Sequence, residues 1–224
     1  MRNPLRVTLL LLGGLLVLVG LALFLLYRAS QQVPEFYREA VAVDPQAQKK
    51  AAGKMVERAA ELNNSLQTKG RWEAAFTAEE INGWLAVELP RAEPPVLPPQ
   101  LHDPRVAIAP DGVTVAAQAE YGGISTVVSL KLDVYLQSPN VLAVRVRDLR
   151  AGAVPWRRDQ VVQNVGRAAE HAGLAVRWQQ IDGDPVALVT LPPQVDHGRT
   201  AHVDAIKLEK DRLVVTGTTE RKGP

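Results

Sequence analysis

Residues 113–136 read VTVAAQAEYGGISTVVSLKLDVYL, with apolar side chains alternating with polar or small ones on either side of Gly122-Gly123. Such alternation is typical of β-strands with one buried face, and a glycine pair between two such runs predicts a tight turn. The second run, Ile124–Leu136, predicts a strand about 40 Å long. This stretch therefore indicates an antiparallel sheet with one continuous apolar face.

Further runs with a period of two flank this stretch and enlarge the predicted sheet. Turn residues separate them, as at Pro110-Asp111-Gly112 and Ser138-Pro139-Asn140. Six prolines within Pro90–Pro104 indicate a loop before the first long strands. The other predicted strands are Trp72–Phe76, Val106–Ile108, Val141–Leu149, Leu174–Trp178, Val186–Leu191, Val203–Leu208 and Leu213–Thr218.

A long helix is predicted from Asp44-Pro45, a favourable helix start, to about Thr68. Its length of about 35 Å matches the Ile124–Leu136 strand, so we expect it to lie along the sheet. The small residues in its apolar stripe predict a close approach of a sheet or helix. That stripe comprises Ala47, Ala51, Met55, Ala59, Leu62 and Leu66.

Two shorter helices complete the predicted α+β fold. Thr77-Ala-Glu-Glu80 is a capping box that opens one of them, which ends before Pro90. Pro155 begins the other, which ends at Gly173. The predicted fold is thus one N-terminal transmembrane helix, then a long helix packed on an antiparallel sheet with two shorter helices.

The N-terminal segment Val7–Tyr27 contains no charged residue and predicts the transmembrane helix. About 20 apolar residues in a helix cross a hydrocarbon core of roughly 30 Å. A cleaved signal peptide is the alternative, but the apolar run is longer than such peptides use. Arg28-Ala29-Ser30 also places an arginine where a small residue is required. We therefore expect a retained anchor with limits at Val7 and Tyr27.

Basic residues before this segment set the predicted orientation in the cell membrane. Arg2 and Arg6 favour a cytoplasmic N-terminus and an extracytoplasmic C-terminal domain in a single-pass protein. The sequence then divides into a cytoplasmic tail at 1–6, the transmembrane helix at 7–27, a juxtamembrane tether at 28–44 and an extracytoplasmic α+β domain at 45–224.

Composition excludes several classes of function. The formal charge is +2, and without Arg2 and Arg6 the chain carries 24 basic and 24 acidic residues. A neutral domain without a basic stripe does not attract nucleic acid. The absence of cysteine excludes disulfides, thiolate metal sites and cysteine nucleophiles.

No motif in the sequence predicts catalysis, a metal site or a cofactor. Glu79 and Glu80 lie in a helical first turn, where capping explains them better than paired acid–base chemistry. Asp182 and Asp184 flank a turn glycine and are typical turn residues. Asp196-His197 and His202 match no common metal-ligand spacing. We therefore expect a protein that is not an enzyme.

The segment Phe76–Leu85, FTAEEINGWL, resembles YpmS-like membrane-anchored proteins of uncharacterised function, whose capped helix carries a pair like Ile81-Asn82. The layout of 45–220 also resembles tubular lipid-binding (TULIP-type) domains. That resemblance implies a curved antiparallel sheet around a long helix and an apolar groove. It implies no catalytic residue and no cofactor.

These features lead to one main functional hypothesis and three alternatives. The main hypothesis is that the domain binds or shuttles a lipid or another apolar ligand on the aliphatic face of the sheet. The first alternative is that this face is a dry core, and the second is that the domain is a non-catalytic scaffold or assembly partner in a cell-envelope complex. The third is an enzyme whose catalytic residues are dispersed along the sequence. The candidate ligand face comprises Val115, Val128, Leu130, Leu132 and Val134.

Overall fold

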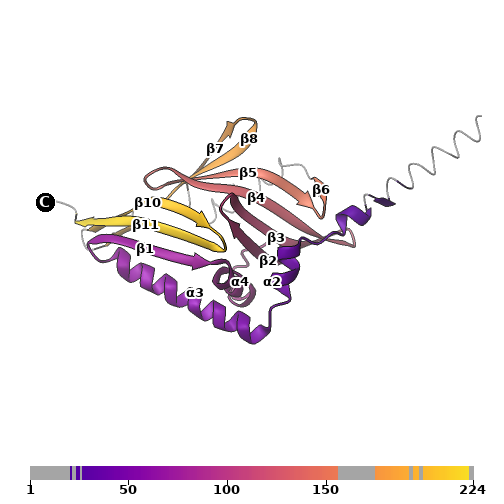
Figure 1. The fold of residues 1–224 in the computed structure, drawn as a ribbon, viewed down its shortest axis with the longest axis horizontal. Helices are drawn as coiled ribbons and strands as arrows, with labels where there is room; N and C mark the ends of the chain where they lie inside the picture. Colours follow the sequence, from indigo (N-terminus) through magenta and orange to yellow (C-terminus); the bar gives the residue numbers. More distant parts are fainter. Residues whose placement is uncertain are drawn as a thin grey trace, which may run out of the picture.

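The computed structural model describes residues 21, 24, 25, 27–155, 175–191, 194–196 and 199–221. Within them the chain is α+β, with long antiparallel strands and a few helices, as the sequence predicts (Figure 1). The helices described over their full length are α2 (Glu35–Val41), α3 (Pro45–Leu66), α4 (Ala78–Val87) and the 3₁₀ helix η1 (Leu89–Arg91), and residues 27–30 before them are also helical.

The strands form two antiparallel sheets rather than one. The four-stranded sheet has the order β1 (Gly70–Thr77), β11 (Arg212–Arg221), β10 (Arg199–Glu209) and β9 (Gln194–Asp196). The seven-stranded sheet has the order β2 (Leu101–Ala109), β3 (Gly112–Tyr121), β4 (Ile124–Ser138), β5 (Val141–Ala151), β8 (Asp184–Thr190) and β7 (Ala175–Ile181), and β6 (Val154–Pro155) pairs with β5.

The turn at Gly122-Gly123 joins β3 to β4, as the alternating pattern predicts, and β4 extends two residues beyond the predicted end. The predicted Pro90–Pro104 loop is shorter than expected. Strand β2 begins at Leu101, and a register shift between His102 and Arg105 accommodates Pro104. Pro155 lies in β6, and the helix predicted after it falls at 156–174, outside the described residues.

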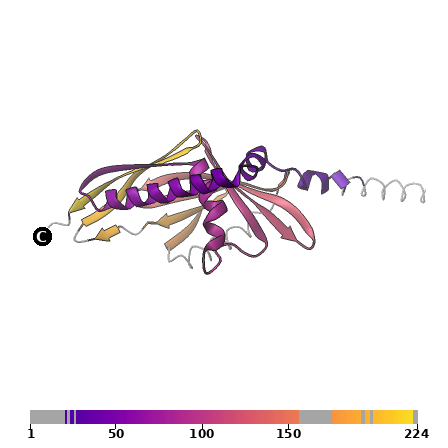
Figure 2. The same cartoon turned by 90° about the horizontal axis from the view of Figure 1, so that it is seen from below.

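Helix α3 begins and ends close to the predicted positions, and Asp44 caps it by accepting hydrogen bonds from the backbone N–H groups of Gln46 and Ala47. Its position differs from the prediction. It packs against α4 and β1, on the four-stranded sheet, and not along β4 (Figure 2). Ala47 and Ala59 of the predicted stripe are consequently exposed.

The contact between α3 and α4 depends on small residues at one point. Ala51 and Ala52 of α3 are only 2% and 3% exposed, and Gly83 of α4 lies against them. A Cβ at Gly83 would lie 2.6 Å from the Cβ of Ala51 and 2.7 Å from the backbone nitrogen of Ala52. The predicted close approach is therefore confirmed at Ala51 of the stripe, with α4 as the partner.

The outer edge of β2 is closed by α4 and by the β10–β11 turn. The Asn82 side chain donates to the Val106 carbonyl at 2.9 Å and accepts from the Val106 N–H at 2.7 Å. The Asp211 N–H donates to the Ile108 carbonyl at 3.0 Å. These bonds satisfy backbone groups that an open edge strand would present to other chains.

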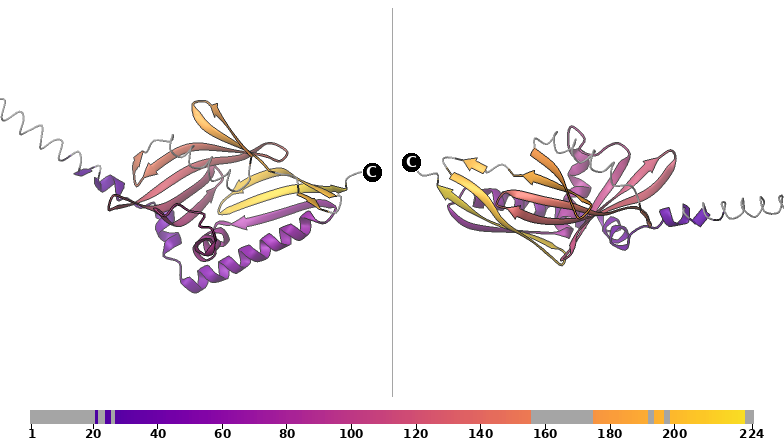
Figure 3. Two further views of the ribbon diagram at one scale, coloured as in Figure 1. Left: turned by 180° about the vertical axis from the view of Figure 1, so that it is seen from behind. Right: turned by 90° about the horizontal axis from the view of Figure 1, so that it is seen from above.

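A second junction joins the two sheets at the β4–β5 turn. Asn140 adopts a positive φ there, and its side-chain oxygen accepts from the Val203 N–H of β10 at 2.8 Å. Its amide nitrogen lies 2.9 Å from Nδ1 of His202. The two junctions place the β10–β11 hairpin beside the seven-stranded sheet (Figure 3).

Residues of the predicted tether lie on the seven-stranded sheet. Tyr37 of α2 is 5% exposed and packs with Ala116 and Val127. Its hydroxyl donates to the Asp103 carbonyl at 3.0 Å. Burial, with the nearby Asp103 carboxylate, raises the pKa of this hydroxyl. Helix α2 is therefore packed as part of the folded domain.

Among the described residues, no helix has the length and apolar character that a membrane crossing requires. Most of the predicted transmembrane segment Val7–Tyr27 lies outside the described residues, which include only Leu21, Phe24, Leu25 and Tyr27 from it.

Candidate functional site

The structure brings the five predicted ligand-face residues together on one face of the seven-stranded sheet. Val128, Leu130, Leu132 and Val134 alternate along β4, and Val115 of β3 lies opposite Leu130. All five are half-buried. Their proximity follows from the strand alternation, while their role as a ligand face stays a prediction.

Aliphatic residues of the neighbouring strands extend this face. Leu130 pairs with Leu149 of β5, and Leu132 pairs with Val113 of β3 and Val146 of β5. Leu149 and Val146 are buried, whereas Leu130 and Leu132 keep part of their surface accessible. The face therefore forms an aliphatic track along β4, which we call the β4 track: Val128, Leu130, Leu132 and Val134.

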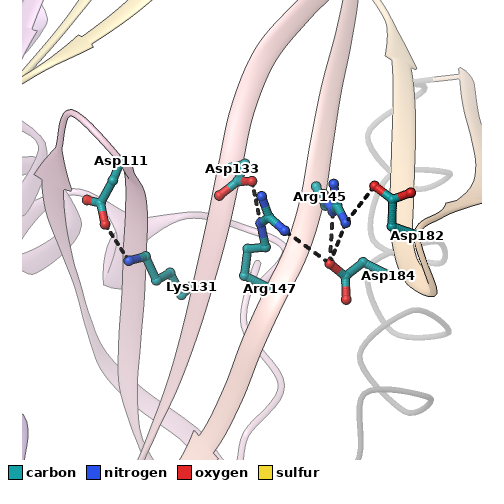
Figure 4. Close-up of polar contacts among 7 residues, drawn as sticks. All are labelled: Asp111, Lys131, Asp133, Arg145, Arg147, Asp182 and Asp184. Atoms are coloured by element: carbon teal, nitrogen blue, oxygen red, sulfur yellow. Dashed lines mark hydrogen bonds and ion pairs between the residues drawn. The ribbon is translucent and has the colours of Figure 1, made fainter.

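The opposite face of the same strands carries a charged network (Figure 4). Arg145 lies 2.8 Å from Asp184 and 3.4 Å from Asp182, and Arg147 contacts both Asp133 and Asp184. Separately, Lys131 lies 2.6 Å from Asp111. The network is alternately basic and acidic across β4, β5 and the β7–β8 turn.

Local geometry explains how these charges meet. A register shift between Lys131 and Leu132 leaves Arg147 as an extra residue of β5, and its guanidinium reaches Asp133 at 2.5 Å. The hydrogen bond to Asp133 raises the pKa of Arg147. The hydrogen bond from Lys131 stabilises the Asp111 carboxylate in the same way and lowers the pKa of Asp111.

The sequence interpretation of Asp182 and Asp184 as turn residues is incomplete. Asp182 does adopt a positive φ in the turn, but both carboxylates also bind Arg145. The Arg145 side chain is only 13% exposed, so this pairing fixes the β7–β8 hairpin to β5. The alternation of basic residues in 141–149 signals a charged face, but it does not identify the partner strand.

Several hollows on the described part of the chain lie apart from the β4 track, and two of them have partly or mainly apolar linings. The larger, about 560 Å³, lies under the proline-rich loop, where Leu89, Val96, Leu101 and Glu120 line it. The smaller, about 260 Å³, lies between α2, α4 and β2 and is lined mainly by apolar residues. The smaller hollow is below the usual size of a site for a drug-sized ligand.

Glu80 confirms the capping interpretation of the two adjacent glutamates. Its carboxylate accepts from the Thr77 N–H at 3.0 Å, and the Thr77 hydroxyl accepts from the Glu80 N–H at 3.1 Å. Arg58 of α3 donates to the same carboxylate at 2.8 Å. Burial opposes ionisation, but the bonds from Thr77 and Arg58 outweigh it, so the pKa of Glu80 is below its usual value.

We expect Glu80→Gln to destabilise the domain at pH 7 by about 1–2 kcal/mol, because it removes a charge-assisted bond to Arg58. Since the folded-state pKa of Glu80 is lowered, its contribution is complete above the ordinary carboxyl value of 4.5 and is lost as the pH falls below it. Urea unfolding at pH 7 and pH 3 measures both effects.

The exposed neighbour provides the control for this experiment. Glu79→Gln should change stability by less than about 0.5 kcal/mol at either pH. A Glu80→Gln variant that differs from wild type equally at pH 7 and pH 3 contradicts the assigned role of the carboxylate.

The residues considered as metal ligands lie only partly within the described structure. His197 lies outside the described residues, and His202 faces Asn140 at the junction of the sheets. In the part of the chain that the structure describes, no group of three or more His, Asp or Glu side chains is placed to hold a metal ion.

Comparisons of the chain with protein-family models, with curated proteins and with solved structures give no match. The resemblance of Phe76–Leu85 to YpmS-like proteins therefore stays a prediction.

Proposed function

We propose that this chain is a single-pass membrane protein whose extracytoplasmic α+β domain binds a lipid acyl chain or a similar apolar ligand along the β4 track. The observation that carries the proposal is the partial exposure of a row of aliphatic side chains, Val128 to Val134, with Val115 beside it. The proposed role is non-catalytic and uses no cofactor.

The membrane anchor is supported by the apolar sequence of Val7–Tyr27 and by the few residues of it that the structure describes. Leu21, Phe24 and Leu25 are each more than half exposed. A run of exposed large apolar side chains is unfavourable in water and is typical of a membrane or protein contact. Arg2 and Arg6 support a cytoplasmic N-terminus in the cell membrane.

The opposite polarity of the two sheet faces supports the position of the ligand. Ion pairs occupy the face that carries Lys131, Asp133, Arg145 and Arg147, and desolvating them under an acyl chain would be costly. The β4 track has no charged group. An acyl chain on the track would remove apolar surface from water at about 25 cal/mol per Å².

The proposed arrangement resembles that of TULIP-type domains, in which a curved sheet and a long helix enclose an apolar groove. The long helix α3 beside an antiparallel sheet supports this part of the proposal. Its contact with β1 rather than β4 places it away from the β4 track, so the ligand would lie on the seven-stranded sheet alone.

Photocrosslinking tests the proposal with the full chain in phospholipid vesicles. A phospholipid with a diazirine on its acyl chain is illuminated, and the modified residues are located by mass spectrometry. We expect modification within 128–134 as well as within 7–27. Modification of 7–27 reports the anchor, so the two parts of the proposal are read separately.

Matched variants on the two faces of β4 sharpen this experiment. Leu132→Gln should reduce labelling of the β4 track several-fold, whereas Tyr135→Gln, an exposed position on the charged face, should leave it unchanged. Labelling confined to 7–27 contradicts lipid binding and favours the scaffold hypothesis.

A further inference from the structure

The chain between the proposed membrane segment and the domain is held by a set of specific contacts. The Ala153 N–H donates to the Ala29 carbonyl at 2.9 Å, and the Thr126 hydroxyl donates to the Ser30 carbonyl. The Gln31 side chain donates to the Ser125 carbonyl at 3.0 Å. The chain therefore docks on β4 and on the β5–β6 turn from Ala29 onward.

Gly152 makes this docking sterically feasible. Its φ of +58° suits glycine, and a Cβ there would overlap the carbonyl oxygens of Ala29 and Ser30. The N–H of Gly152 donates to the Val127 carbonyl at 2.8 Å, which holds the turn against β4. The backbone of 29–30 thus lies directly on the β5–β6 turn.

Almost no free chain remains between the proposed membrane boundary and the first docked residue. Tyr27 is the predicted end of the transmembrane segment, and Ala29 is two residues later. Two residues reach at most about 7 Å, and Tyr27–Ser30 is helical, which shortens the reach further. A domain connected in this way has little freedom to move away from the bilayer.

We infer that the domain is held against the bilayer with the β3–β4 turn at Gly122-Gly123 and the β5–β6 turn at Gly152 facing the lipid headgroups. The interaction surface is the end of the seven-stranded sheet beside 29–31, and its partner is the bilayer surface. The turn between α3 and β1 lies at the opposite end of the molecule (Figures 1 and 3).

This orientation rests on the proposed membrane anchor. It also defines which end of the proposed ligand face lies nearer the bilayer. Strand β4 starts at the membrane-facing turn, so Val128 is the member of the β4 track nearest the bilayer and Val134 the farthest. An acyl chain leaving the bilayer would meet Val128 first.

Site-specific fluorescence quenching tests the orientation, and the absence of native cysteine makes labelling clean. The full chain carries a fluorophore at Glu120→Cys, beside the β3–β4 turn, or at Lys69→Cys, in the α3–β1 turn; both positions are exposed. Each protein is placed in phosphatidylcholine–phosphatidylglycerol vesicles containing a lipid with a nitroxide headgroup. We expect quenching several-fold stronger at 120 than at 69.

A third protein tests the role of the docked chain. Gly152→Ala in the Glu120→Cys background should release 29–31 and reduce quenching at 120, while near-UV circular dichroism and resistance to protease report whether the domain remains folded. A domain that unfolds leaves the comparison of positions 120 and 69 as the deciding measurement.

The outcomes separate the inference from the proposed function. Equal quenching at 120 and 69 in protein that floats with the vesicles overturns the orientation and leaves the anchor in place. Protein that does not float with the vesicles overturns both the anchor and the orientation.

Discussion

Replacement of Gly83 by alanine is expected to destabilise the domain by about 2 kcal/mol or more, although alanine favours helices over glycine by about 1 kcal/mol. The added Cβ would lie 2.6 Å from Cβ of Ala51 and 2.7 Å from the carbonyl oxygen of Gln48. The Gln48 oxygen belongs to the backbone of α3, so a rotamer change cannot relieve the overlap. The two helices must separate, and Ala51 loses its close packing.

A second helical glycine provides a matched control. Gly53 of α3 is exposed, and a Cβ there would meet no atom within 4 Å. Gly53→Ala should therefore stabilise the domain by about 0.5–1 kcal/mol through helix propensity alone. Urea unfolding of the full chain in a mild detergent measures both variants. Stabilisation by both substitutions would show that α3 and α4 are not in close contact.

The α3–α4 contact illustrates what sequence periodicity reveals and what it leaves out. The stripe of small residues predicts that another element approaches α3 closely, but it does not name that element. Matching lengths favoured the long strand β4, whereas α4 and β1 are the partners. The residue that permits the close contact of α4 with α3 is Gly83. It is a single glycine inside a short helix, and a single position gives no periodic signal.

Strand pairing can likewise be predicted from the sequence only in part. Alternation and turn residues predict the hairpins formed by neighbours in the sequence, such as β3–β4 and β10–β11. Pairings between distant segments, such as β1 with β11 and β5 with β8, depend on the whole fold. For this reason the sequence placed all strands in one sheet, and the ion pair between Arg145 and Asp184 was not predicted.

The residues of the candidate ligand face can be predicted from the sequence, whereas the pairing of charges on the opposite face cannot. A period of two assigns Leu130 and Leu132 to the same side of β4 whatever strands lie beside them. Predicting the charged network from the sequence requires the additional knowledge that the β7–β8 turn lies next to Arg145. Local patterns therefore predict the chemistry of a face, and tertiary pairing decides which charges on it meet.

Asn82 shows how a residue noted in a motif acquires a physical role only in the fold. In the sequence, Ile81-Asn82 is singled out only because it resembles a residue pair in YpmS-like proteins. In the structure the Asn82 amide binds both backbone groups of Val106, in the way that a neighbouring strand would. Helix α4 thereby protects the edge of the seven-stranded sheet.

Asn82→Leu is accordingly expected to destabilise the domain by about 2–4 kcal/mol. Leucine has a similar volume but leaves the N–H and the carbonyl of Val106 without partners, and each unsatisfied buried group costs about 1–3 kcal/mol. Water reaching the opened edge of β2 would recover part of the loss. Urea unfolding gives the free-energy change, and hydrogen exchange should show faster exchange of the Val106 amide.

Asn63→Leu, at an exposed position of α3, is the matched control and should change stability by less than about 0.5 kcal/mol. If leucine is tolerated equally at 82 and 63, Asn82 does not close the edge of β2, and the helix must be held there by its apolar contacts alone.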